Sequence, residues 1–347
     1  MTIDVGVIGV GSMGRHHARV AHELPGAELV GVADVDEEHA VAVAEEFDTG
    51  ALSNAELLES VEAVSVAVPT PFHHEVALDA LEAGVHVLVE KPIARTVAEA
   101  SELVEVAHSL DLTLQVGHVE RFNPAVRSVR RFVDDLDIVA VDARRLGPPI
   151  DGDRALTEGV VLDLMIHDLD IIRSLIGAEV TEVTASGRPD GEYVAATLGF
   201  ENDVVGSVTA SRITQRKVRE LTLTTTESQI TIDYIDRSVR IHRRTRPEFR
   251  VDDGELRYRT EQVVERPTVG NGEPLKREFE AFLEAVRNGT TPVVTGRDGL
   301  EALSLARRVE TALQRGPPDL GREHVAVDTG HPEFDPSHSG RADSRRG

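Results

Sequence analysis

A histidine and two carboxylates recur at helical spacing in the stretch DLMIHDLDII, residues 163–172. Asp163 lies four residues before His167 and Asp170 three residues after it, so at about 100° per residue all three share one helix stripe. A separate arc is apolar: Leu162, Met165, Ile166, Leu169 and Ile172. A carboxylate one turn from a histidine can fix the ring tautomer and stabilise its protonated form. The stretch therefore predicts a general base, with a polar helix face in water as the alternative.

One lysine is the second candidate for chemistry. Only three of the 37 basic residues are lysine, and Lys91 directly follows the apolar run VHVLVE, residues 85–90. An amine can lose or share a proton near neutral pH when it is desolvated, whereas a guanidinium effectively cannot. If this run is a strand of a parallel sheet, Lys91 lies at the carboxyl edge, where such sheets bind ligands. We predict a chemical role that arginine could not fill; the alternative is a strand-end lysine in solvent.

A glycine-rich loop lies near the start of the chain, in GVIGVGSMG, residues 6–14. A strand-like run precedes the loop and a helical pattern follows it. In that context Gly9 allows a tight turn, Gly11 lets a pyrophosphate approach the backbone, and Gly14 lets the helix pack on the sheet. The helix N-terminus offers unpaired N–H groups to phosphates. We predict a dinucleotide site, the alternative being an ordinary solvated turn that opens a helix.

The next strand-like run ends in Asp34, about 20 residues after the glycines, where a carboxylate accepts hydrogen bonds from the adenosine ribose. A carboxylate there repels the extra phosphate of NADP, and no arginine follows closely, so we predict NAD. The predicted cofactor contacts are Gly9, Gly11, Ser12, Met13, Gly14, Asp34, Pro69, Thr70, His73, Glu90 and Lys91.

The elements around these residues predict an α/β protein. From residue 2 to about 117, short Val-rich runs alternate with helical patterns, which predicts a doubly wound parallel sheet of Rossmann type. Thr96 and Glu99 form a capping box for one of its helices. The strands are expected at residues 3–8, 27–33, 62–68, 85–90 and 112–117, and the first helix at about 12–24.

After about residue 122 the pattern changes. A helical segment is followed by period-two stretches, which predict a second α+β domain on a mostly antiparallel sheet open on one face. The helical patterns are at 160–176, 274–289 and 299–316, and the strand patterns at 181–186, 192–200, 203–213 and 218–226. We predict a nucleotide-binding domain at 1–117, a substrate-binding and oligomerisation domain at 118–316, and a disordered tail at 317–347.

Composition limits the chemistry further. The 347 residues include no cysteine, which excludes disulfides, thiolate nucleophiles, iron–sulfur clusters and cysteine-ligated zinc. The pairs His16–His17 and His73–His74 are adjacent, and adjacent helical side chains diverge, so we predict no metal site. No apolar run approaches the roughly 20 residues that span a bilayer, and residue 1 leads straight into a strand-like run, so we predict a cytoplasmic location.

The charge of the chain bears on its partners. A net charge of −24 disfavours nucleic acid and anionic membranes, because phosphate groups need a basic face. The acidic excess is spread along the chain, as in cytosolic proteins of salt-accumulating archaea, and an acidic protein encoded by a GC-rich genome is the alternative. Stability measured against salt separates the two.

Four stretches, taken in order, resemble the glucose-fructose oxidoreductase and inositol dehydrogenase (Gfo/Idh/MocA) family. They are GVIGVGSMGRHHA, VAVPTPFHHEVALDALEAGVHVLVEKPIA, GHVERFNPAV and VVLDLMIHDLDII, and the resemblance runs from about residue 3 to 316. It implies a Rossmann domain, then an α/β domain whose open sheet supports a homodimer or homotetramer, with the active site between them. It assigns Lys91 to substrate hydroxyl and nicotinamide contacts, Asp163 to substrate orientation, and His167 to acid–base catalysis.

The resemblance also implies a substrate class. Three stretches resemble most closely the members that oxidise UDP-N-acetylglucosamine at the 3-hydroxyl: GHVERFNPAV, RRLGPPIDGDR and GVVLDLMIHDLDII. A pyrophosphate needs local cations, for which Arg121, Arg145 and Arg154 are the candidates, and Asn123 is a further predicted substrate contact. Nearby aspartates offer Arg154 an alternative role in an ion pair.

Two other functions stay open at this stage. A free-sugar or inositol dehydrogenase would use the same Lys91, Asp163 and His167 without phosphate-binding arginines. A non-catalytic NAD-sensing protein would need the glycine loop but no general base. The presence of Lys91, Asp163 and His167 together argues against this function.

Overall fold

The computed structural model describes residues 2–149, 158–244, 248–252, 255–259 and 262–315. The predicted tail at 317–347 and the candidate Arg154 lie outside the described residues.

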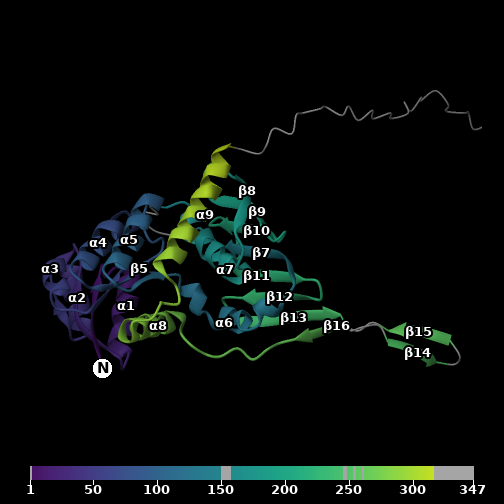
Figure 1. The fold of residues 1–347 in the computed structure, drawn as a ribbon, viewed down its shortest axis with the longest axis horizontal. Coiled ribbons are helices and arrows are strands. Elements are labelled where there is room, and N and C mark those ends of the chain that lie inside the picture. The colour runs from purple at the N-terminus through teal and green to yellow at the C-terminus, as the bar shows by residue number, and fades with distance from the viewer. Residues whose placement is uncertain (1, 150–157, 245–247, 253–254, 260–261, 316–347) are drawn as a thin grey trace, which may run out of the picture. The chain divides into compact units, whose positions relative to one another are not determined.

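The first sheet confirms the predicted Rossmann arrangement (Figure 1). Its strands are β1 (Ile3–Ile8), β2 (Ala27–Ala33), β3 (Gly50–Ala51), β4 (Ala63–Val66), β5 (His86–Glu90) and β6 (Leu114–Gly117). They are all parallel, in the order β3-β2-β1-β4-β5-β6. Val-rich strands suit this position because both faces of the sheet are covered. The strand order reverses beside β1, and ligands bind at the carboxyl ends of the strands at such a point.

Helices cover both faces of this sheet. They are α1 (Ser12–Glu23), α2 (Glu37–Glu46), α3 (Asn54–Leu58), α4 (His73–Glu82) and α5 (Val97–Ser109), with a 3₁₀ turn at Thr70–Phe72. The predicted capping box is present at the start of α5, where the Thr96 side chain accepts from the Glu99 N–H and the Glu99 carboxylate accepts from the Thr96 N–H. It satisfies two backbone donors that a helix start otherwise leaves free.

The second sheet has eight strands in the order β16-β13-β12-β11-β7-β10-β9-β8. Neighbours are antiparallel except for the parallel pair β7 and β10. The predicted strands appear as β8 (Val180–Gly187), β9 (Tyr193–Phe200), β10 (Val205–Ser211) and β11 (Val218–Thr225). Four further strands complete the sheet: β7 (Ile138–Leu146), β12 (Ser228–Asp233), β13 (Ser238–Arg244) and β16 (Gln262–Glu265). A separate hairpin joins β14 (Glu248–Asp252) to β15 (Glu255–Arg259).

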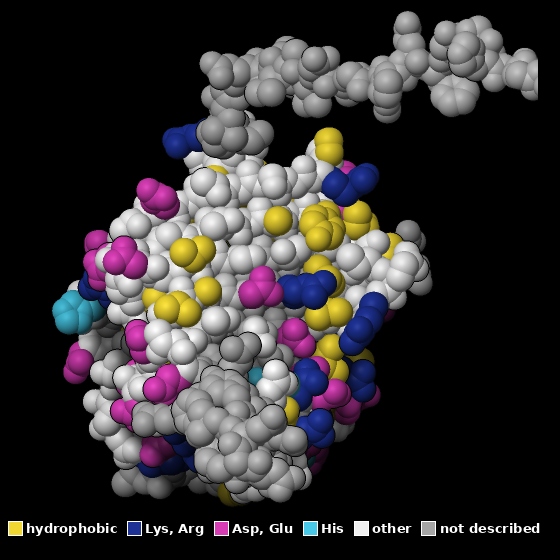
Figure 2. All heavy atoms as spheres, turned by 90° about the vertical axis from the view of Figure 1, so that its right-hand side faces the viewer, with side chains coloured by type: hydrophobic (Ala, Val, Ile, Leu, Met, Phe, Trp, Pro, Cys, Tyr) yellow, Lys and Arg dark blue, Asp and Glu magenta, His cyan; other side chains and the backbone are white. Residues whose placement is uncertain are grey.

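One face of the second sheet is buried and the other is open, as predicted. Along β9 and β10, buried residues alternate with more exposed ones. Figure 2 views the molecule from the side on which Figure 1 shows this sheet, and hydrophobic side chains lie there among acidic and basic ones.

Helices fill the buried side of the second sheet and connect it to the first. A π-helical turn, Val161–Met165, leads into α7 (Ile166–Ile176), which contacts β7. The other helices are α6 (Pro124–Arg130), α8 (Pro274–Asn288) and α9 (Gly296–Arg315), with 3₁₀ turns at Val119–Phe122 and Val133–Asp135. Helix α9 contacts both α5 and α7, and α8 contacts α1, so both sheets belong to one compact unit. In the described part of the chain, no helix is long and apolar enough to cross a bilayer.

Candidate active site

The backbone around the loop after β1 explains each of its three glycines. Gly9 has φ +83°, and a Cβ there would lie 2.7 Å from Val68. A Cβ on Gly14 would lie 1.7 Å from the carbonyl oxygen of Gly9, so any side chain would push α1 away from the loop. A Cβ on Gly11 would meet nothing within 4 Å. The open space at Gly11, in front of the α1 N-terminus, fits the pyrophosphate of a dinucleotide.

Asp34 lies at the end of β2, next to this loop. One carboxylate oxygen accepts from the Val10 N–H at 2.7 Å and the other from the Asp36 N–H at 3.0 Å. An ionised carboxylate has about four acceptor positions, so both oxygens keep capacity for ribose hydroxyls. Asp34 thus joins the glycine loop to the place where a ribose would lie.

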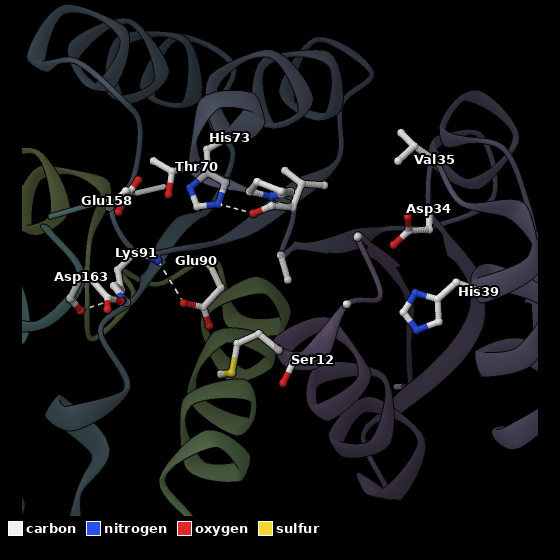
Figure 3. Close-up of a pocket in the computed structure, with 16 residues that line it drawn as sticks. Ser12, Asp34, Val35, His39, Thr70, His73, Glu90, Lys91, Glu158 and Asp163 are labelled. Atoms are coloured by element: carbon white, nitrogen blue, oxygen red, sulfur yellow. Dashed lines mark hydrogen bonds and ion pairs between the residues drawn. The ribbon is translucent and has the colours of Figure 1, made fainter. Parts of the chain in front are cut away.

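These residues line one cavity of about 520 Å³, shown in Figure 3. Of the predicted cofactor contacts, every one except Gly14 lines it, and Gly14 lies beneath the loop. The lining residues that the sequence analysis missed are Val35, His39, Ala67, Val68 and Glu158. Val35 and His39 could have been found, because they closely follow Asp34 at the same sheet edge. Glu158 comes from the second domain and gives no local signal in the sequence.

Lys91 and Asp163 meet at one end of the cavity (Figure 3). The Lys91 Nζ donates to the backbone oxygen of Asp163 at 2.9 Å and lies 3.2 Å from its carboxylate. Lys91 comes from the end of β5 and Asp163 from the π-helical turn before α7, so the two domains each supply one of these groups. An ammonium has three donors, and the pairing with Asp163 leaves one for a substrate oxygen.

A buried carboxylate supports the backbone of Lys91. Glu90 accepts from the Lys91 N–H at 3.1 Å, and its other oxygen lies 3.0 Å from the ring of buried His17. The second nitrogen of that ring is 2.6 Å from the Ser65 hydroxyl. Burial works to raise the pKa of Glu90, but the His17 hydrogen bond and nearby Lys91 outweigh it and lower the pKa below its ordinary value. The chain of contacts fixes the residue that precedes Lys91.

His73 holds the same loop from the other side. Its ring nitrogens lie 2.7 Å from the carbonyl oxygen of Pro92 and 2.8 Å from that of Val68, as Figure 3 shows for the second contact. Burial lowers the pKa of His73. Both nitrogens already face backbone oxygens, so the contact that His73 offers to a cofactor is the side of its ring.

His167 lies in the first turn of α7, one turn beyond Asp163. Its Nδ1 is buried without a hydrogen-bond partner among the described residues. Burial lowers the pKa of His167 well below the ordinary histidine value, and the charges of Lys91 and Arg145 lower it further. A neutral imidazole at neutral pH is a proton acceptor.

The predicted pairing of Asp163 with His167 is wrong. Asp163 bonds to Lys91 instead, and the Nδ1 of His167 has no hydrogen-bond partner among the described residues. The expected stripe assumed an ideal α-helix, whereas Asp163 lies in a π-helical turn, which changes the direction of the side chains. The predicted apolar arc is buried, but Asp170 is also 1% exposed, so the alternative of a polar face in water is wrong too.

Two of the predicted pyrophosphate arginines are committed to buried carboxylates. Arg121 makes a bidentate pair with Asp170, both contacts 2.7 Å. Arg145 pairs with Asp168 at 2.7 and 3.1 Å and with Glu120 at 3.1 Å. Neither arginine lines the cavity at Lys91. This corrects the expectation: carboxylates on a buried helix require partners, and these arginines supply them.

Asn123 is also structural. It is 3% exposed, its carbonyl oxygen accepts from the Ala125 N–H at the start of α6, and its amide donates to Glu120 and to the Tyr234 carbonyl. Its predicted contact with substrate is therefore corrected. No group of three or more metal-ligating side chains occurs within the described ranges.

Comparisons with known proteins agree with this geometry. A family model described as "Oxidoreductase family, NAD-binding Rossmann fold" matches residues 3–118, and one described as "Oxidoreductase family, C-terminal alpha/beta domain" matches 148–317. UDP-N-acetylglucosamine 3-dehydrogenase of Acidithiobacillus ferrooxidans is 32% identical, covering 89% of this chain and 96% of that protein. The scyllo-inositol 2-dehydrogenase (NAD(+)) of Bacillus subtilis is 28% identical, covering 92% and 98%.

A solved structure gives the same result. The structure of the Acidithiobacillus ferrooxidans UDP-N-acetylglucosamine 3-dehydrogenase matches with a TM-score of 0.82 and 30% identity, covering 91% of this chain and 99% of that one. With both family models matched across most of its length, the chain belongs to the Gfo/Idh/MocA oxidoreductase family.

Proposed function

We propose that this protein is an NAD-dependent dehydrogenase that oxidises a secondary hydroxyl of a nucleotide sugar, with the 3-hydroxyl of UDP-N-acetylglucosamine as the lead candidate. The observation that carries the proposal is the contact of Lys91 with Asp163 at one end of the cavity that begins at the glycine loop. A cation and a carboxylate at this end of the cavity support a sugar hydroxyl binding there, beside a dinucleotide held by the glycine loop.

The residues account for the proton in this reaction. The dinucleotide supplies a two-electron acceptor at its nicotinamide ring. His167, neutral because burial lowers its pKa, takes the proton of the substrate hydroxyl. Lys91 donates to the same oxygen and stabilises its growing negative charge, while Asp163 holds the ammonium in place. The carbinol becomes a carbonyl, and the hydrogen on its carbon leaves with both bonding electrons.

Two substrate classes compete. The nucleotide-sugar class is supported by the relative at 32% identity, and a free-sugar or inositol class by inositol dehydrogenases at 28% and 27%. The test is NADH formation, in low and in high salt, with UDP-N-acetylglucosamine, UDP-glucose, free N-acetylglucosamine, glucose and myo-inositol. Turnover of only the UDP-N-acetylhexosamine supports the proposal. Turnover of only a free sugar or polyol replaces the substrate class, and none at all with NAD bound favours a sensing protein.

Asp34 should select NAD. The Asp34→Ala protein should bind NAD about tenfold more weakly, because it loses charge-assisted hydrogen bonds to the ribose, and should discriminate less against NADP. Titration of both cofactors by calorimetry checks this. The matched control is Glu38→Ala, which removes an exposed carboxylate four residues away and outside the cavity lining. Unchanged NAD affinity in Asp34→Ala would refute the role.

The pH dependence of kcat/KM should report the protonation state of His167. A general base must be neutral to accept a proton, and a lowered pKa keeps His167 neutral as the pH falls below the ordinary histidine value of about 6.5. Initial rates of NADH formation should therefore give a kcat/KM that is level from pH 7 to about 6.5 and declines only at lower pH. A kcat/KM that already falls above pH 6.5 would contradict the assignment of His167 as the general base.

The open sheet is the proposed surface of a homodimer or homotetramer. Its exposed face carries small residues such as Ala195, Thr209 and Thr222, which lets a second sheet pack at about 10 Å. Light scattering should give a mass of two or four times 37.7 kDa, and Thr209→Arg should lower it by forcing an unpaired charge into the interface. A monomeric native protein would exclude the assembly.

A further inference from the structure

A second cavity, of about 270 Å³, lies where β7, β10 and β11 run side by side. Ten of the described residues line it, and four of these are basic: Arg145, Arg212, Lys217 and Arg219. None of these ten is acidic, although the chain as a whole carries a net charge of −24. A concentration of positive charge in so acidic a protein indicates a site for an anion.

Two of these cations already have partners. Arg145 is held by Asp168 and Glu120. Arg212 donates to the backbone oxygen of Glu158 and lies 3.8 Å from the Asp163 carboxylate. Both guanidinium groups therefore already have oxygen acceptors within the protein.

Arg219 and Lys217 are different. Arg219 is directly opposite Arg145 in the β11–β7 pairing, and like charges opposite each other destabilise a sheet. Arg219 is partly buried, yet neither it nor Lys217 has a carboxylate within 4.0 Å among the residues that the structure describes. Burial and the charge of Arg145 lower the pKa of Arg219. Lys217, just before β11, and Arg219, in β11, both line the cavity, so a ligand there would meet both charges.

The second cavity adjoins the proposed catalytic groups. Arg212 lines it and also contacts Glu158 and Asp163, which line the first cavity. Leu164 lines the second cavity and is the neighbour of Asp163 in the chain. The two linings therefore share a boundary, and an anion in the second cavity would lie next to the place where Lys91 meets the reacting hydroxyl.

We propose that Arg219 and Lys217 bind the pyrophosphate of the sugar nucleotide, in place of Arg121 and Arg145. This inference rests on the proposed function, because it assumes that the sugar reaches Lys91. A guanidinium and an ammonium fit a diphosphate, which offers acceptors to both and neutralises the charge that the sheet leaves unpaired. The uridine and the rest of the nucleotide would lie beyond the pyrophosphate, away from Lys91.

The test uses calorimetric titration with UDP and, separately, steady-state kinetics. The variants are Arg219→Gln and Lys217→Gln, and the matched control is Arg216→Gln, which removes an equal charge from an exposed neighbour that does not line the cavity. Each test variant should weaken UDP binding and raise the KM for UDP-N-acetylglucosamine about 10- to 100-fold, with kcat changed less than about threefold. The control should match the native protein, and Arg219→Lys should restore part of the affinity.

A structural role for Arg219 predicts a different result. Removing an unpaired, partly buried charge should leave the midpoint of thermal unfolding unchanged or higher, whereas loss of a structural contact would lower it. Inorganic phosphate should bind more weakly than UDP; equal affinity for the two would reduce the site to a single-phosphate pocket and overturn the diphosphate assignment.

The two proposals fail in different ways. UDP binding that is absent, or equal in Arg219→Gln and the control, overturns this inference even if a free sugar is oxidised. UDP binding that depends on Arg219, without turnover of any sugar, keeps the pyrophosphate site and overturns the dehydrogenase.

Discussion

The His167→Ala protein should bind NAD as tightly as the native protein and turn over its substrate about 1,000-fold more slowly. General bases contribute roughly 100- to 10,000-fold to a rate, and burial lowers the pKa of His167, the histidine one turn beyond Asp163. Cofactor affinity should not change, because the His167 side chain does not line the cofactor cavity. NADH formation under saturating conditions and calorimetric titration of NAD measure the two quantities separately.

Two companion variants make this result specific. Lys91→Ala should also abolish turnover, because it removes the donor to the substrate oxygen and the ammonium that Asp163 contacts. His74→Ala is the matched control: this histidine pairs with Glu102 on the surface and should leave kcat/KM within about twofold. Unimpaired turnover in both His167→Ala and Lys91→Ala would refute the proposed site.

The cofactor half of the site could be predicted because its causes are local. The tight turn requires Gly9, the approach of a pyrophosphate to the backbone requires Gly11, and the packing of α1 against the loop requires Gly14. All three requirements act over a few residues of sequence. The parallel sheet follows from strands buried on both faces, which makes their sequences continuously apolar. Because Lys91 directly follows β5, its position at the carboxyl edge of the sheet could be predicted as well.

The substrate half depended on contacts between distant parts of the chain. Lys91 and Asp163 are 72 residues apart, and Arg121 and Asp170 are 49 apart, so no spacing rule connects them. The π-helical turn before α7 altered the direction of Asp163, which an ideal helical period does not anticipate. The exceptional position of Arg219 became visible only once the pairing of β11 with β7 placed it opposite Arg145.

These contacts also explain why charged residues occur on an otherwise apolar helix. Asp168 and Asp170 are both at most 1% exposed, and each is neutralised by one arginine from another element. Burial raises the pKa of Asp168, and the adjacent Arg145 opposes that rise. The two ion pairs fix the position of α7, and hence of His167, relative to β7 and the segment before α6.

Replacing Arg145 with methionine should destabilise the fold by about 3–5 kcal/mol, because it leaves the Asp168 carboxylate buried without its partner. Urea unfolding followed by circular dichroism measures the change. If Arg145 instead served the pyrophosphate, the variant would keep its stability and lose affinity for UDP.

The double variant Arg145→Met/Asp168→Leu tests whether the unpaired Asp168 carboxylate causes the loss of stability in Arg145→Met. Removing both charges also removes the cost of an unpaired buried carboxylate, so the double variant should be more stable than Arg145→Met alone. The recovery of stability should be incomplete, because Glu120 also loses its contact with Arg145 and keeps only the Asn123 amide. A double variant no more stable than the single one would show that Arg145 acts through its packing on the Tyr234 ring, 5.3 Å away, rather than through Asp168.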